Sequence, residues 1–550
     1  MEPVLELSEL SSADELVLGS AYKGVFEKGG IRLNPRVKGV LKGAPQLSDG
    51  AAVAARFVKI AGAELVFSFL QAGEVDVRRV EKNFVEKTAS DLSDGEQASV
   101  TGKIVCVNRA GIDKGYLLDG TGVAALEASE LEDGAFVRVL GVAKAGSPPV
   151  IVADSVNGVP KGGLGTKIAE YLEKNSEPFS PPLFLDDEVM RTLRPKIAEC
   201  VRFLKRRLLE FQPLLIRYHG DADGVCSALL FFSAVKKFLS GRGVSLDTNR
   251  FLASATQTDS AIYSRADLAA DAERAALLPK KPVFVFLDHA ANHESFPQLV
   301  QLNEGGYEIV IIDHHPPAPG APHLAKHFVS PFAANGSSDY TAGLLCFELA
   351  KAISGGADER LARISLQGDK SVFAPKEPLK EPRVIDYLAT YNSPDSLDFY
   401  EKILSDSKKV DYYFEEANNR IKRTVAASKP FVKEKRVGSG LIVTVKLDKF
   451  CKKGEYPTKG SVLTEIHRSF SGGPVVSLGY GGDAIIFRAN QEALDKGFKA
   501  GALISQLKEE FPHAVVSGGG HDAAASMRVN EQFLPSVLER AVALAEAVFQ

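Results

Sequence analysis

Residues 213–224 read Pro-Leu-Leu-Ile-Arg-Tyr-His-Gly-Asp-Ala-Asp-Gly. An apolar run without alternation, closed by glycine and aspartate and followed by a helical pattern over about 224–240, is typical of a strand buried on both faces. Similar apolar runs follow at 282–287 and 308–312, again separated by helical patterns. This alternation predicts an α/β domain with a parallel sheet covered by helices.

Acidic and histidine side chains follow each of these strands. In a parallel sheet, groups that come directly after the carboxyl ends of neighbouring strands share one edge, where ligands bind. We therefore expect five aspartates and up to four histidines to meet there. They are His219, Asp221 and Asp223 after the first strand, Asp288 and His289 after the second, Asp313, His314 and His315 after the third, and Asp369 after a later helix.

Such a concentration of carboxylates repels itself unless cations are bound. Oxygen and imidazole ligands without thiolates favour Mn²⁺, with Mg²⁺ or Co²⁺ as substitutes. The candidate ligands exceed what one ion needs, and two ions about 3.5–4 Å apart activate water and stabilise the leaving oxygen of a phosphoester. Each motif alone is more typical of a turn or a helix cap, but four of them in order predict a two-metal phosphoesterase.

The remaining sequence divides into further domains. Residues 1–95 and 96–160 contain short alternating runs separated by Gly and Asp, which predict two β-rich domains. The second resembles an OB-fold, a barrel that commonly binds single strands, although a barrel used for packing or protein contact has the same pattern. We expect the parallel-sheet domain over 185–393, a helical connector over 394–424 and a second α/β lobe over 425–550.

The charge balance places any nucleic-acid contact in local patches. The chain has 550 residues, with 66 Lys and Arg against 70 Asp and Glu, so it has no general basic excess. Residues 420–460 contain twelve basic and three acidic residues, which suits either a phosphate backbone or a solvated charged face. Five scattered cysteines without a C-x-x-C pair, and no apolar run long enough for a membrane span, favour a cytoplasmic protein.

The four ordered motifs resemble those of the DHH phosphoesterase family. The segments Ser517-Gly518-Gly519-Gly520-His521 and Ile486-Phe-Arg488 resemble the GGGH-type DHH-associated C-terminal domain. The resemblance covers about 190–550. It implies metal binding by His219, Asp221, Asp223, Asp288, His314 and Asp369, catalytic roles for Asp313, His314, His315 and His289, and substrate binding by Arg488, Gly518, Gly519, Gly520 and His521. Ser337 and Ser338 either cap the next helix or bind phosphate.

Within the family, the C-terminal lobe and the OB-like module favour a RecJ-like exonuclease of the archaeal type. The resemblance thus implies Mn²⁺-dependent hydrolysis of single-stranded DNA or RNA by in-line attack of activated water. Two alternatives remain: a phosphodiesterase for short oligonucleotides or cyclic dinucleotides, and a replication or repair scaffold of the Cdc45 type with partners such as GINS. The complete ligand set argues against a scaffold that has lost catalysis.

Overall fold

The computed structural model forms two compact units. One comprises Met1–Glu177, Arg206–Gln212 and Leu239–Asn249, and the other comprises Pro178–Lys205, Pro213–Phe238 and Arg250–Gln550. The structure describes residues 4–7, 13, 16, 18–61, 64–74, 77–80, 84–108, 114–128, 131–390, 397–452 and 454–550.

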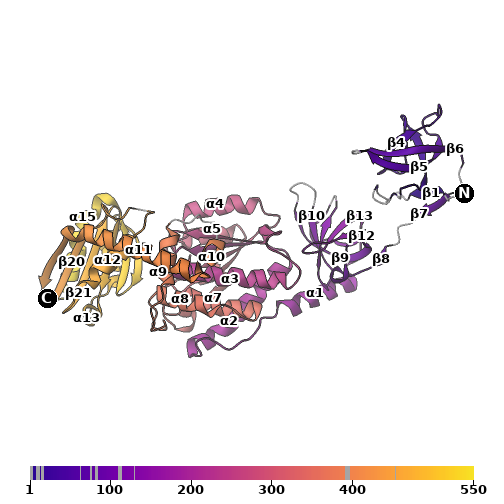
Figure 1. The fold of residues 1–550 in the computed structure, drawn as a ribbon. Coiled ribbons are helices and arrows are strands. Elements are labelled where there is room, and N and C mark those ends of the chain that lie inside the picture. The colour runs from indigo at the N-terminus through magenta and orange to yellow at the C-terminus, as the bar shows by residue number, and fades with distance from the viewer. Residues whose placement is uncertain are drawn as a thin grey trace. The chain divides into compact units, whose positions relative to one another are not determined.

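Two five-stranded rings make up most of the first unit (Figure 1). In the first ring, β2 pairs with β3, β3 with β4, β4 with β6, β6 with β5, and β5 again with β2. β1 and β7 extend this sheet beyond β2. The strands are β1 (Val4–Leu7), β2 (Ala21–Glu27), β3 (Gly30–Arg32), β4 (Lys38–Lys42), β5 (Ala52–Ala61), β6 (Glu64–Ala72) and β7 (Val77–Val80).

The second ring repeats this order of strands. β9 pairs with β10, β10 with β11, β11 with β13, β13 with β12, and β12 again with β9. Five strands closed in this way form the small barrel expected of an OB-like module. The strands are β8 (Val85–Glu86), β9 (Gln97–Asn108), β10 (Lys114–Leu118), β11 (Val123–Glu127), β12 (Phe136–Lys144) and β13 (Val150–Gly158), and helix α1 (Gly162–Ser176) follows.

A five-stranded parallel sheet forms the centre of the second unit, in the order β15-β14-β16-β17-β18. Its strands are β14 (Leu214–His219), β15 (Ala253–Thr258), β16 (Val283–Leu287), β17 (Glu308–Ile312) and β18 (His327–Val329). β14, β16 and β17 are the predicted apolar runs. β15 was not predicted, because Ala-Ser-Ala-Thr-Gln-Thr has no apolar run and lies at the edge of the sheet.

Helices cover both faces of this sheet, as the α/β prediction requires (Figure 1). α4 (Arg265–Ala276) and α5 (Phe296–Glu304) pack through Ala275, Leu299 and Leu302 on the face that carries Phe284 and Phe286. α2 (Glu188–Leu209), α3 (Ala222–Ser240) and α7 (Ala342–Ser354) lie on the other side, and α8 (Glu359–Gly368) packs against α7.

The chain then passes through α9 (Glu381–Ala389), α10 (Leu397–Leu404) and α11 (Ser407–Ser428) into a mixed six-stranded sheet. The strand order is β19-β20-β21-β22-β24-β23, and only β20 and β21 are parallel. The strands are β19 (Val432–Val437), β20 (Gly440–Lys446), β21 (Val475–Gly481), β22 (Ala484–Ala489), β23 (Val515–His521) and β24 (Ala524–Val529).

Helices cover both faces of the second sheet as well. α12 (Lys459–Arg468) packs on one face, while α14 (Ala500–Glu510) and α15 (Leu534–Ala547) pack on the other. Residues 491–510 form two helices, α13 (Gln491–Asp495) and α14, because Gly497 adopts a φ of 99° that a continuous helix excludes. None of the described helices is both long and apolar enough to span a membrane.

Candidate metal centre

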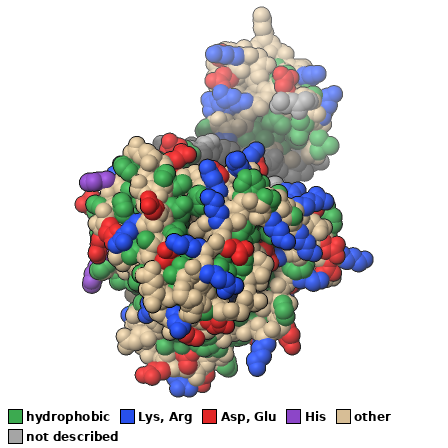
Figure 2. Space-filling view, turned by 90° about the vertical axis from the view of Figure 1, so that its left-hand side faces the viewer, with side chains coloured by type: hydrophobic (Ala, Val, Ile, Leu, Met, Phe, Trp, Pro, Cys, Tyr) green, Lys and Arg blue, Asp and Glu red, His purple; other side chains and the backbone are tan. Residues whose placement is uncertain are grey.

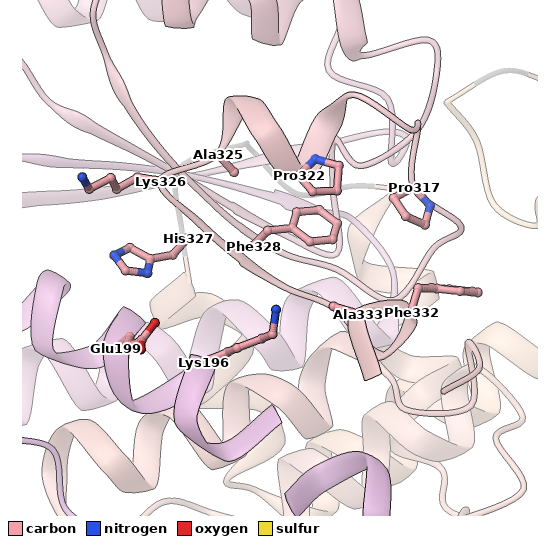
Figure 3. A pocket seen from close by; sticks show the side chains of 10 residues that line it. All are labelled: Lys196, Glu199, Pro317, Pro322, Ala325, Lys326, His327, Phe328, Phe332 and Ala333. Carbon is pink, nitrogen blue, oxygen red and sulfur yellow. The ribbon is translucent and has the colours of Figure 1, made fainter. Parts of the chain in front are cut away.

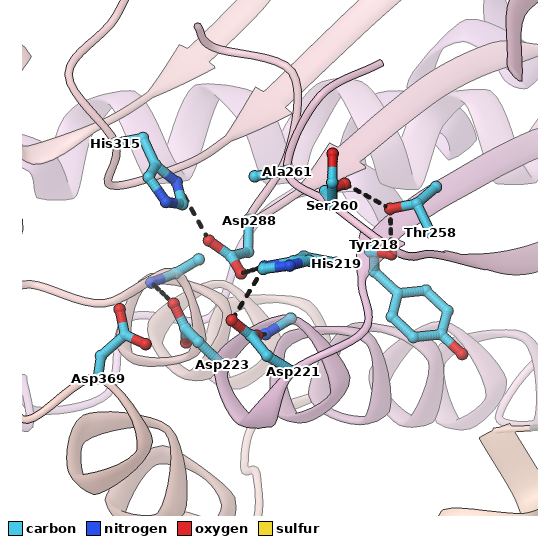
Figure 4. Close-up of polar contacts among 12 residues, drawn as sticks. Tyr218, His219, Asp221, Asp223, Thr258, Ser260, Ala261, Asp288, His315 and Asp369 are labelled. Atoms are coloured by element: carbon cyan, nitrogen blue, oxygen red, sulfur yellow. Dashed lines mark hydrogen bonds and ion pairs between the residues drawn. The ribbon is translucent and has the colours of Figure 1, made fainter. Parts of the chain in front are cut away.

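The adjacency of three strands brings the predicted motifs together. β14, β16 and β17 are neighbours in the parallel sheet, so the residues that follow them lie at one edge. Asp288, directly after β16, has a φ of 53°, which is unusual for a residue with a side chain. Asp369 reaches the same place from the carboxyl end of α8. Figure 4 shows these side chains pointing toward one another.

One group of ligand atoms surrounds His314. Its Nε2 lies 3.1 Å from Asp369 Oδ2, 3.4 Å from Asp223 Oδ2 and 3.4 Å from Asp288 Oδ1. Its Nδ1 lies 2.6 Å from the carbonyl oxygen of Ser338, which only accepts, so Nδ1 donates. Nε2 therefore presents a lone pair to the carboxylates when the ring is neutral, as in a metal-ligating histidine.

A second group forms around His219. Its Nδ1 lies 2.9 Å from Asp221 Oδ2 and 3.2 Å from Asp288 Oδ2. The trio His219, Asp221 and Asp288 shares no residue with the trio Asp223, His314 and Asp369, and each offers three ligand atoms within 4.8 Å of one another. A third such trio, Asp288, His314 and His315, shares one residue with each of them. Two sets of three ligands suit two cations. Asp288 lies between the two sets, because its Oδ2 faces His219 and its Oδ1 faces His314.

His315 is oriented by Asp313. The ring Nδ1 lies 2.8 Å from Asp313 Oδ1, and the same oxygen accepts the backbone N–H of His315 at 3.0 Å. Asp313 Oδ2 accepts the backbone N–H of Ala291 at 3.1 Å. Asp313 is fully buried, whereas the side chain of His315 is 34% exposed. The buried carboxylate of Asp313 thus orients the ring of His315, and the ring itself is partly exposed to solvent.

Backbone groups hold the buried carboxylate of Asp223. Its oxygens accept the N–H groups of Ala342 and Gly343 at 2.8 and 2.7 Å and the hydroxyl of Ser365 at 2.6 Å. Gly343 is required here, because a Cβ at that position would lie 2.4 Å from Ser365 Oγ. These contacts place a carboxyl group at the start of α7, where the helix dipole favours a negative charge.

The pKa values follow from this crowding. Burial and the charge of Asp288 raise the pKa of Asp223 well above its usual range, and burial and Asp221 raise the pKa of Asp288. Burial alone lowers the pKa of a histidine, yet the neighbouring carboxylates raise the pKa of His314 well above its usual range. Protons thus compensate the negative charge where no cation is present.

The donor set fits divalent cations. Asp288 Oδ1 and His314 Nε2 are buried and have no hydrogen-bond partner. Unsatisfied buried polar atoms are costly, and a cation between them would satisfy both. Carboxylate oxygens and imidazole nitrogens without thiolates are the ligands expected for Mn²⁺ or Mg²⁺.

His289, to which the resemblance assigns a catalytic role, belongs to none of the ligand trios. Its ring is fully buried, stacks on Phe286 with a centroid distance of 5.8 Å, and lies 6.1 Å from the Tyr263 ring. Neither ring nitrogen has a hydrogen-bond partner. Burial, with the nearby charge of His219, lowers the pKa of His289 to about 3, so the ring is neutral.

Ser337 and Ser338 do not cap α7. Thr341 does so, since its side chain accepts the N–H of Leu344. The hydroxyl of Ser337 donates to Asp339 at 2.8 Å, and Ser338 contributes its backbone carbonyl to His314. The contribution of Ser338 to the site is therefore made by its backbone.

The glycines of the C-terminal lobe lie in an edge strand and not in a loop. Gly518, Gly519 and Gly520 belong to β23, which pairs with β24. A Cβ on Gly518 would lie 2.6 Å from the Cβ of Met527, and Gly520 has a φ of 132°. The backbone of His521 closes this strand, and its side chain lies outside the described part of the structure.

Arg488 lies close to the last motif of the metal centre. Its Nε donates to Thr464 Oγ1 at 2.9 Å, and its Nη1 donates to the carbonyl of Phe487 at 2.8 Å. Burial, followed by the charges of Arg488 and Arg468, lowers the pKa of Lys370, the residue after Asp369. Burial and nearby cations, Arg488 first, lower the pKa of His467 to about 4. Cations from both lobes therefore gather next to the acidic cluster.

Sequence reasoning missed Lys370, His467 and Asp386. Asp386, on α9, lies near the cluster, and burial together with the charges of Asp221 and Asp369 raises its pKa to about 7. The available signal was an aspartate inside the apolar run Val-Ile-Asp-Tyr-Leu. Lys370 and His467 gave no such signal, because the two residues come close to each other and to Arg488 only when the two sheets pack.

The basic stretch 420–460 is interrupted by acidic partners. Lys435 pairs with Glu546 at 2.7 Å, and Lys446 lies 3.6 Å from Asp448. On the face that Figure 2 presents, Lys and Arg side chains lie among Asp and Glu. In this respect the stretch resembles a solvated charged face.

A pocket of about 330 Å³ lies between α2 and the residues near β18 (Figure 3). None of the predicted site residues lines it. Lys196 and Glu199 of α2 form one wall, and residues near β18 form the other, including His327, Phe328 and Phe332.

Comparisons with known proteins agree with this fold. Residues 214–367 match the DHH family, N-terminal domain. An uncharacterized protein of Methanocaldococcus jannaschii is 24% identical over an alignment of 630 positions, which covers 98% of this chain and 83% of that protein. Among solved structures, the DHH domain of a member of a family of ribosomal proteins matches with a TM-score of 0.63 and 23% identity, over 70% of this chain and 98% of that chain. RecJ from Thermus thermophilus with Mn²⁺ matches with a TM-score of 0.43 and 16% identity, over 70% of this chain and 57% of that chain.

Proposed function

Since residues 214–367 form a DHH family domain, we propose that the protein is a Mn²⁺-dependent, RecJ-like exonuclease that hydrolyses phosphodiester bonds of single-stranded DNA or RNA. The observation that carries this proposal is the pair of separate ligand trios, His219, Asp221 and Asp288 on one side and Asp223, His314 and Asp369 on the other. Two cation sites at one sheet edge are the arrangement that phosphodiester hydrolysis uses.

Bound divalent cations would lower the pKa of water and stabilise the charge that develops on the phosphate. The protein's own part is positioning. Asp313, whose pKa is lowered to about 2 by His315 although burial raises it, stays charged and holds Nδ1 of His315 protonated. His315 therefore keeps one orientation, and its Nε2 remains for a hydrogen bond to a phosphate oxygen or to the leaving oxygen.

The cations next to the cluster support a phosphate-bearing substrate. Arg488 lies near enough to Lys370 for its charge to lower the pKa of that lysine, and a bound anion would relieve this repulsion. The glycines of β23 carry no Cβ, so the end of a nucleic-acid strand would meet no side chain there. A scaffold without catalysis would not require both ligand trios, so the intact set favours an enzyme.

The test is a panel of DNA and RNA strands of graded length, each labelled at the 5′ or the 3′ end, incubated with the purified protein and Mn²⁺. We expect release of mononucleotides from one end, and loss of at least about 100-fold in rate for Asp369→Asn. Asp495→Asn is the matched control, because Asp495 is exposed at the end of α13. Equal rates for wild type and Asp369→Asn would refute the proposal, whereas turnover of dinucleotides only would favour the small-substrate phosphodiesterase.

A further inference from the structure

The two barrels have the same strand order but opposite charge. The five strands of the first ring span 21–72, which contain eight Lys and Arg against three Asp and Glu. The second ring spans 97–158, which contain five Lys and Arg against seven Asp and Glu. A polyanion is attracted by the first and repelled by the second.

The cations of the first barrel lie on its outer surface. Lys42, Ser68 and Arg56 are register partners across β4, β6 and β5, and all three are exposed. The preceding row, Leu41, Phe67 and Phe57, is buried in the core. Because side chains alternate along a strand, the first row faces solvent as one stripe across three strands.

Further cations border this row. Lys59 on β5 and Lys38 on β4 are exposed, and Lys38 is the register partner of Arg32 on β3. Arg32 and Lys38 share one carboxylate, Glu27, at 3.1 and 3.7 Å. Lys42 and Lys59 have no ion pair with any residue of the described part of the barrel. The surface thus has more positive charge than its own acidic groups neutralise.

Apolar side chains are exposed on the same two strands, β5 and β6. Val58 and Ile60 of β5 are 43% and 64% exposed, and Leu70 of β6 is 43% exposed. Apolar groups beside cations suit a single strand, since its bases are unpaired and present apolar faces next to charged phosphates. A duplex keeps those faces stacked inside.

Other parts of the chain cover the second barrel at β10 and at the loop before β13. Tyr116 on β10 is 8% exposed, stacks on Phe211 at a centroid distance of 4.1 Å, and donates to Asn249 Oδ1 at 2.5 Å. Ser147, in the loop before β13, donates to the carbonyl of Gly243 at 2.6 Å. All of these residues belong to the same compact unit. In an OB-fold the second and third strands form the binding face, and here the second strand, β10, packs against protein through Tyr116.

We propose that the first barrel, through Lys42, Arg56 and Lys59 on its outer face, binds single-stranded nucleic acid, and that the second barrel is a structural module. This assigns to 21–72 the role that the sequence predicted for 96–160. The proposal extends the proposed function, but binding is measured without divalent cations and cleavage is measured separately, so the failure of one is distinguishable from the failure of the other.

The test compares two triple variants of the full chain. Lys42→Ala/Arg56→Ala/Lys59→Ala removes three exposed charges from the first barrel, and Lys114→Ala/Arg138→Ala/Lys144→Ala removes three exposed charges from the second. Binding of a fluorescent 20-mer is followed by anisotropy in EDTA over a series of salt concentrations. We expect the first variant to bind at least about tenfold more weakly near 0.1 M salt, with a salt slope smaller by about 2, and the second to stay within about twofold of wild type.

Melting curves by circular dichroism show whether both variants fold. The proposal is overturned if the folded first variant binds as wild type does, or if both variants lose affinity equally. It is also overturned if polyglutamate of similar length competes as well as an unlabelled strand, because the surface would then fit an acidic protein segment. Loss of binding without loss of dinucleotide cleavage would support the proposal and leave the metal centre unaffected.

Discussion

The Nδ1 of His314 donates to the backbone carbonyl of Ser338 at 2.6 Å, while its Nε2 has no hydrogen-bond partner and faces three carboxylates. The loop before α7 thus selects the tautomer of this histidine. A backbone contact of this kind is independent of the side chain of the residue that provides it.

Ser338→Ala should therefore leave the rate of Mn²⁺-dependent cleavage within about twofold of wild type, because only the carbonyl is used. His314→Ala should lower it at least about 100-fold, since a ligand to the cation is lost. Initial rates at saturating Mn²⁺ check both. A large loss in Ser338→Ala would instead show that the hydroxyl binds substrate.

Asp288→Asn should separate stability from metal binding. Burial and Asp221 raise the pKa of Asp288, so removing this charge should not lower the melting temperature of the metal-free protein. In wild type, Mn²⁺ at about 100 times its Kd should stabilise the fold by about 2.7 kcal/mol, and the variant should lose most of this gain. Thermal melts with Mn²⁺ and with EDTA measure both effects. An unchanged Mn²⁺ effect in Asp288→Asn would contradict a role for this carboxylate as a shared ligand.

His289→Phe should be tolerated. The ring is fully buried between aromatic side chains and uses neither nitrogen, so a phenyl ring preserves its packing against Phe286. We expect cleavage within about threefold of wild type. Because the wild-type ring cannot take up a proton until about pH 3, whereas the unfolded chain does so near pH 6.5, the variant should also lose less stability on acidification to about pH 5. A loss of about 100-fold in rate would restore His289 as a catalytic residue.

Asp386→Asn should stabilise the metal-free protein at high pH. Burial, Asp221 and Asp369 raise the folded pKa of Asp386 to about 7, above the unfolded value near 4. Its contribution to stability is therefore present below about pH 4 and lost as the pH rises through about 7. The free energy of unfolding of the variant minus that of wild type should be about 1–2 kcal/mol larger at about pH 8 than at about pH 5, after allowance for partial exposure. Urea titrations in EDTA measure this difference in the free energy of unfolding. An equal difference at both pH values would contradict a raised pKa for Asp386.

Much of the parallel sheet was predictable, because β14, β16 and β17 are almost wholly buried and mostly apolar, β16 without interruption. β15 was not predictable in this way, since an edge strand needs no apolar run. Its pairing with β14 is a property of the folded sheet and not of its local composition.

Part of the candidate site was likewise predictable from the sequence, and part was not. Ligands that directly follow strands were placed by the order of the motifs, but a motif does not give the direction of each side chain. Asp288 and Ala290 both have a positive φ, and this backbone path turns His289 into the aromatic core. Asp386 comes close to the cluster only through the packing of α9, and Arg488 approaches Lys370 only through the packing of the second sheet, which no short pattern records.

The most direct test of the two-cation centre is the number of Mn²⁺ ions that bind to the full chain, measured by equilibrium dialysis together with electron paramagnetic resonance. The two ligand trios predict two ions with mutual magnetic coupling in wild type, and one uncoupled ion in Asp369→Asn. Binding of a single uncoupled ion by wild type, or of none, would contradict the account.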